Sequence, residues 1–315
     1  MSATGFQILR SSDGGAPALD GQAGSLINVL DALLDIGGSD AYWAKAFTGT
    51  NKAAYRAANG ERFYLRVDDS VGQYARVRGY ASMSDVDTGS GDFPTTTHQT
   101  NYNWHKSNTA DSTARTYVGI ATDRFVLLLV SGGWTGSGQD LYFFGEPKKF
   151  YASDTGSTVL HGYPGNTIGT SAFRQGGQST NPYSISGSYN APSNNTSGMM
   201  PFAKTADGAG AAGTGVYFAP SPSTSVPFGT YGYLPLIPLL CGSTVSGTAG
   251  LLRAALPHIY ALPNYETDPN LAAGDTFTDD DGRTYQICTP AGTASLSSSA
   301  ALFAIMTSNT ETAVP

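Results

Sequence analysis

The chain has 315 residues, of which only 13% are charged, and its net charge is −7. A surface that binds nucleic acid shows a clustered excess of lysine and arginine, so this acidic balance argues against nucleic acid as a partner. The 39 glycines, 18 tyrosines and 14 phenylalanines favour strands joined by many turns. We expect a mainly β fold of antiparallel meander or sandwich units, with one short amphipathic helix near the N-terminus and long irregular arms.

The predicted helix covers residues 25–36. Ser25 is a candidate N-cap, and Gly37 provides the left-handed exit that is common at helix C-termini. The apolar stripe at helical spacing consists of Leu26, Val29, Leu30, Leu33 and Leu34. No basic segment followed by an apolar run precedes this helix, so we expect no secretory signal.

Residues 60–80 predict a β-hairpin with one apolar and one charged side. With a turn at residues 70–72, Val67 pairs with Ala75, and the apolar residues then share one face. The opposite face carries three arginines, Arg66, Arg76 and Arg78. Such a face suits a solvated or partner-facing surface, with a cation–π contact to a neighbouring tyrosine.

Asp68 and Asp69 fall where the first strand of this hairpin meets the turn. Aspartate is favoured there because its side chain bonds the local backbone. We therefore expect both residues to be structural, and their replacement by asparagine to leave the fold intact. The alternative is a carboxylate site shared with Asp85 and Asp87.

We divide the chain into three parts. Residues 1–153 form a β-rich N-terminal unit, in which the uninterrupted apolar run of residues 125–130 predicts a central strand covered on both faces. Residues 154–215 are rich in glycine, serine and asparagine and predict an extended arm that becomes ordered only against neighbouring subunits. Residues 216–315 form a second β-rich unit.

In the C-terminal unit, residues 231–242 predict buried extended chain, because two prolines interrupt a run too short to cross a membrane. We therefore expect no membrane insertion. Residues 274–288 predict a hairpin with an odd-numbered loop and Gly282 in the left-handed position. Residues 296–308 predict a last strand.

Few residues have the spacing that catalysis or metal binding requires. Cys241 and Cys288 stand in unrelated contexts and indicate buried thiols. The histidines lack metal-ligand spacing, no GxSxG elbow anchors a catalytic triad, and Glu61 and Glu146 stand alone in the sequence. We expect no cofactor, no metal and no enzymatic activity.

Three aromatic residues in polar surroundings, Tyr102, Trp104 and Trp134, are candidate contacts to a glycan or a partner subunit. The competing interpretation is that each ring covers the end of its own sheet.

Four segments, YWAKAFTGTNKAAYR, RFYLRVDD, YARVRGY and MSDVDTGSGDFP, together resemble structural proteins encoded in the late gene clusters of tailed bacteriophages of Gram-negative hosts. The resemblance covers residues 17–150 most clearly and brings no catalytic residues with it. It implies a virion component, made in the host cytoplasm, whose partners are other copies of itself and other virion proteins. A tail or baseplate position is preferred over head decoration.

Two alternative functions remain open. The first is a receptor-binding tail module that presents its aromatic residues to host surface glycans, and the second is a hydrolase that degrades the host envelope.

Overall fold

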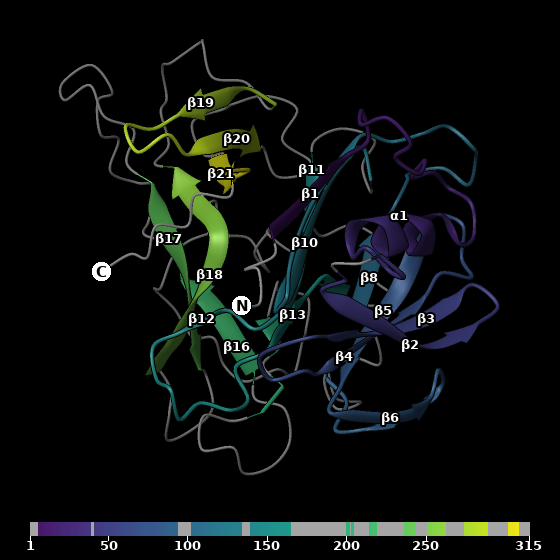
Figure 1. Ribbon diagram of the computed structural model, residues 1–315, viewed down its shortest axis with the longest axis horizontal. Helices are drawn as coiled ribbons and strands as arrows, with labels where there is room; N and C mark the ends of the chain where they lie inside the picture. Colours follow the sequence, from purple (N-terminus) through teal and green to yellow (C-terminus); the bar gives the residue numbers. More distant parts are fainter. Residues whose placement is uncertain are drawn as a thin grey trace.

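The computed structural model describes residues 6–38, 41–93, 102–133, 139–164, 200–201, 203–204, 214–218, 236–243, 251–262, 274–288 and 302–308. Within these residues the chain forms one helix and a set of antiparallel strands (Figure 1). The prediction of a mainly β fold is therefore confirmed.

The central sheet has the strand order β1-β9-β10-β11-β13. Its strands are β1 (Phe6–Arg10), β9 (Tyr117–Thr122), β10 (Phe125–Ser131), β11 (Gln139–Gly145) and β13 (Val159–His161). Successive residues of β10 alternate between two different apolar clusters, with Leu128 in one and Leu127 and Leu129 in the other. The prediction of a central strand covered on both faces is confirmed.

The outer sheet has the order β14-β8-β5-β4-β3-β2. Its strands are β2 (Trp43–Gly49), β3 (Lys52–Ala57), β4 (Tyr64–Asp68), β5 (Tyr74–Tyr80), β8 (Tyr102–His105) and β14 (Tyr163–Pro164). A small hairpin of β6 (Ser82–Asp85) and β7 (Thr88–Ser90) follows β5.

The β4–β5 hairpin differs from the predicted register by two residues. Val67 pairs with Val77 rather than with Ala75, so the chain turns through a longer connection. A shift of two residues keeps every side chain on its predicted face, because the side-chain period of a strand is two. The apolar face is accordingly buried.

The C-terminal sheet has the order β15-β16-β17-β18-β21-β20-β19. The short strand β12 also pairs with β18, antiparallel. The strands of this sheet are β12 (Lys148–Lys149), β15 (Met200–Pro201), β16 (Thr214–Phe218), β17 (Ile237–Ser243), β18 (Leu251–Leu262), β19 (Thr276–Thr278), β20 (Thr284–Cys288) and β21 (Leu302–Met306). The predicted hairpin is confirmed, since Phe277 pairs with Tyr285 and Gly282 has a φ of 78°. The predicted last strand is confirmed as β21.

Helix α1 (Ser25–Leu33) buries the predicted apolar stripe completely. The predicted Ser25 cap is wrong, because Gly24 occupies the N-cap position and the Ser25 hydroxyl donates to the Asp20 carbonyl at 2.8 Å. The N–H groups at the start of the helix instead donate to Asp69, a residue far away in the sequence.

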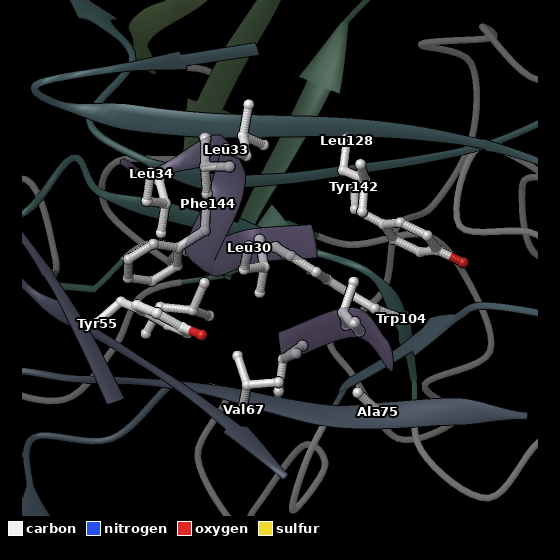
Figure 2. Packing of buried hydrophobic residues seen from close by; sticks show 14 of the residues in the cluster. Leu30, Leu33, Leu34, Tyr55, Val67, Ala75, Trp104, Leu128, Tyr142 and Phe144 are labelled. Carbon is white, nitrogen blue, oxygen red and sulfur yellow. The ribbon is translucent and has the colours of Figure 1, made fainter. Parts of the chain in front are cut away.

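The three sheets are stacked in layers (Figure 1). One apolar cluster joins α1 to the inner face of the outer sheet and to one face of the central sheet, and a second joins the other face of the central sheet to the C-terminal sheet. Figure 2 shows Leu30 of α1 between Leu128 of the central sheet and Val67 of the outer sheet. The central sheet is therefore covered on both sides.

The predicted arm begins inside the described part of the chain. β13 lies within residues 154–164 and pairs with β11, with His161 opposite Phe143. Most of the remaining predicted arm, up to residue 215, lies outside the described residues, so its ordering against neighbouring subunits stays a prediction.

Candidate functional site

The charged side of the β4–β5 hairpin is the outward surface of the outer sheet. We call this surface the arginine face, and its members are Arg56, Tyr64, Arg66, Tyr74, Arg76 and Arg78. They point outward because the alternating positions, such as Leu65 and Val77, are fully buried against the core. The sequence thus predicted correctly which side of the hairpin carries the charge.

Arg66 is held by three acceptors on this face. Its Nε donates to the Val86 carbonyl at 2.9 Å, and its guanidinium contacts the carboxylates of Asp68, at 3.3 Å, and Asp87. The Lys52 ammonium contacts the same Asp87 at 2.8 Å. Asp87 arrives from the connection between β6 and β7, so this hairpin neutralises part of the arginine face.

Two further arginines are also positioned by the chain itself. Arg78 pairs with Asp92 and lies 5.6 Å from the centre of the Tyr80 ring. Arg56 lies 4.9 Å from the centre of the Tyr64 ring. Both arrangements are cation–π contacts of the kind predicted for this face.

Arg76 differs from its neighbours. It is exposed, and among the described residues no carboxylate pairs with it. It is therefore the member of the arginine face with the most unused hydrogen-bonding capacity.

Two carboxylates of this surface, Asp68 and Asp87, have a lowered pKa. Hydrogen bonds from Lys52 and Arg66 lower the pKa of Asp87. Burial alone would raise the pKa of Asp68, but hydrogen bonds with Ser70 and the charge of Arg66 lower it overall. Within the described ranges, no group of three or more histidine, cysteine, aspartate or glutamate residues lies close enough to hold a metal ion.

Asp69 has a different environment from its neighbour Asp68. Its side chain is fully buried, and its Oδ2 accepts the N–H groups of Leu26, at 2.8 Å, and Ile27, at 3.3 Å. Its Oδ1 contacts the equally buried Lys106 ammonium. Burial raises the pKa of Asp69, and the Lys106 charge and the two helix N–H groups oppose that rise.

This geometry corrects the interpretation of Asp69 as a simple turn residue. Asp69 caps helix α1 from 43 residues away and forms a buried ion pair. Replacing it by asparagine would leave Lys106 buried without its counter-charge, so the fold should not tolerate that change unaffected.

A polar cleft of about 550 Å³ lies where the turn between β3 and β4 meets the ends of the central sheet. Its charged and aromatic lining consists of Glu61, Phe63, Arg124, Glu146, Lys149 and Lys204. The two glutamates stood alone in the sequence, and the fold brings them to the same ammonium, with Lys149 Nζ 3.4 Å from Glu61 Oε1 and 2.8 Å from Glu146 Oε1.

Both glutamates are occupied by donors from the chain. Glu61 accepts the backbone and hydroxyl donors of Ser157 and Thr158, at 2.6–3.0 Å. Glu146 accepts the Glu61 N–H at 2.9 Å and lies 3.4 Å from Arg124. Burial alone would lower the pKa of Lys149, but its contacts with Glu146 and Glu61 raise it overall.

Two of the three aromatic candidates, Tyr102 and Trp104, are buried. Tyr102 is 5% exposed, and Trp104 is fully buried, with its Nε1 donating to the His161 carbonyl at 2.9 Å. The prediction of accessible rings is therefore wrong for these two, because β8 lies inside the sheet and its residues pack between layers. Trp134 lies outside the described residues.

Buried titratable groups elsewhere behave as parts of the core. Burial lowers the pKa of His105 to about 4 and raises the pKa of Cys241 to about 12. Cys241 and Cys288 are free, buried thiols, as predicted.

Within the part of the chain that the structure describes, no helix is long and apolar enough to cross a membrane. A scan against protein-family models and a search of curated proteins give no match to this chain.

Proposed function

We propose that the chain is a structural component of a tailed phage virion, in the tail or baseplate rather than as head decoration, and that it acts by binding other subunits rather than by turnover. The observation that carries this proposal is the arginine face. Arginine and tyrosine are enriched among the residues that dominate protein interfaces. The segments that resemble phage structural proteins include β2 to β7, which build and flank this face.

The side chains of the arginine face are also preorganised for binding. Arg56, Arg66 and Arg78 are already held by contacts within the chain, so less side-chain freedom is lost when a partner covers them. The face mixes these arginines with Asp68, Asp87 and Asp92. Mixed charge of this kind suits contact with another copy of the same surface, where each sign meets its opposite.

Arg76→Glu tests this role with little risk to the fold, because Arg76 is exposed. Arg66 and Arg78 are poorer probes, since their replacement would also release Asp87 and Asp92. We expect the purified full chain to self-associate in sedimentation velocity, and Arg76→Glu to weaken that association at least about tenfold, with high salt acting in the same direction on the wild type. Lys148→Glu, which makes the same charge change on the C-terminal sheet, should leave it unchanged.

Immunogold electron microscopy of phage particles whose genome carries this sequence tests the location. Antibodies against the chain should label tails or baseplates. Particles that carry no label would contradict the proposal, and so would hydrolysis of host envelope polysaccharide by the purified chain.

A further inference from the structure

The polar cleft carries more positive than negative charge. Three cations line it, Arg124, Lys149 and Lys204, against two carboxylates, Glu61 and Glu146. Glu61 is directed to the interior by its bonds to residues 157 and 158, and Lys149 lies between the two glutamates. The excess charge therefore belongs to Arg124 and Lys204.

Both of these residues keep unused donors. The Arg124 side chain is 52% exposed, and its one ion pair within the described part of the chain, to Glu146, is 3.4 Å long. A guanidinium has five N–H donors in a planar fork, so most of them remain available. Lys204 has no carboxylate partner among the described residues, and its ammonium lies 5.9 Å from the centre of the Phe63 ring.

The segment that carries Lys204 is fixed to the cleft wall. The N–H of Lys204 donates to the Gly156 carbonyl at 3.1 Å, and its own carbonyl accepts from the buried Arg253 at 2.8 Å. A Cβ at Gly156 would lie 2.2 Å from the Lys204 Cβ, so the two backbones approach closely. Lys204 is thus held in place at the backbone while its ammonium can reach a ligand.

We propose that this cleft binds a small hydroxylated oxyanion, an acidic monosaccharide whose carboxylate or phosphate group contacts Arg124 and Lys204. A guanidinium recognises such groups with two parallel hydrogen bonds. The volume of about 550 Å³ lies within the range of small-molecule sites, and the mainly polar lining suits a hydroxylated body.

Isothermal titration of the full chain at low salt tests this site with four probes: glucuronate, glucose 6-phosphate, glucose and inorganic phosphate. We expect saturable binding of glucuronate or glucose 6-phosphate, and the stronger of the two identifies the oxyanion as carboxylate or phosphate. Glucose should not bind measurably. Binding of inorganic phosphate as tight as that of glucose 6-phosphate would overturn the assignment of a sugar.

The double variant Arg124→Gln with Lys204→Gln should weaken binding at least about tenfold, because two charge-assisted contacts are lost. The matched control, Arg76→Gln with Lys148→Gln, makes the same charge change outside the cleft and should bind as the wild type does. Lys204→Gln alone breaks no ion pair of the described chain, so it reports on the site even if the double variant fails to fold. Affinity unchanged in Lys204→Gln, or absent for both charged sugars in the wild type, would overturn the proposal.

This site is independent of the arginine face. Loss of self-association in Arg76→Glu and loss of sugar binding in Lys204→Gln would be separate results, because Arg76 lies on the arginine face and Lys204 lines the cleft.

Discussion

At the scale of single residues, adjacent aspartates in one sequence motif have different roles. Asp68 remains on the arginine face, where Arg66 and Ser70 hold it. Asp69 turns into the core, where the Lys106 ammonium and the first N–H groups of α1 surround it. A buried carboxylate is expensive to desolvate unless such donors offset the cost, so Asp69 depends on Lys106 and Lys106 depends on Asp69.

The roles of Asp68 and Asp69 can be separated by mutation. Asp69→Asn should lower the free energy of unfolding by about 3–5 kcal/mol, because it leaves a buried ammonium without its counter-charge. Asp68→Asn, the matched control one residue away, should cost at most about 1 kcal/mol, since its ion pair is near the surface. Urea unfolding of the purified chain measures both. Equal small losses would restore the interpretation that both aspartates serve only the turn.

At the scale of elements, local sequence patterns predicted much of the structure. The stripe of α1, the two faces of the β4–β5 hairpin and the left-handed Gly282 follow from spacings of two to four residues, which are visible in the sequence. The register of the hairpin and the cap of α1 were missed together. The cap depends on Asp69, which turns into the core towards a helix 43 residues away, and no local pattern encodes that contact. Asp69 also lies in the β4–β5 connection, whose length the sequence did not show.

The contact between α1 and the central sheet depends on a small residue. A Cβ at Gly119 in β9 would lie 2.6 Å from the Leu33 Cδ2, and Leu33 is fully buried. Gly119→Val should therefore push the helix from the sheet and destabilise the fold by about 1–3 kcal/mol, although valine favours strands. Thermal unfolding measures the effect. Gly14→Ala is the control, because nothing lies within 4 Å of the added atom, and an equal loss there would rule out overpacking as the cause.

At the scale of the whole molecule, charged side chains join layers that are distant in sequence. Glu61 binds residues 157 and 158, and Asp154 forms a bidentate pair with Arg253, with both contacts at 2.6 Å. The partners are separated by 96 to 99 residues. The polar cleft is built from such contacts, which explains why Glu61 and Glu146 looked isolated in the sequence. Most of the arginine face belongs to one hairpin, so its charged side was visible in the sequence.

The pair of Asp154 and Arg253 ties strand β18 to the segment that follows β12. Both side chains are buried, and Arg253 also donates to the Lys204 carbonyl, so this pair anchors the C-terminal sheet beside the cleft. Asp154→Asn should weaken two charge-assisted bonds to a buried guanidinium, at a cost of about 3–5 kcal/mol. We expect the loss to be local, because β18 contacts the central sheet through apolar packing that remains. Hydrogen exchange should become faster in residues 251–262 and stay slow in residues 117–131.

The control for that experiment is Asp111→Asn, which removes an exposed pair with Arg115, 3.9 Å long, and should change neither region. If exchange instead rises equally in β18 and in β9 and β10, the central and C-terminal sheets open as one cooperative unit. The Asp154–Arg253 pair would then stabilise the whole stack, and the layered arrangement would not divide into parts of different stability. Unchanged exchange in both regions would show that the pair positions β18 against the segment after β12 but adds little stability, because the desolvation cost of a buried ion pair can offset its attraction.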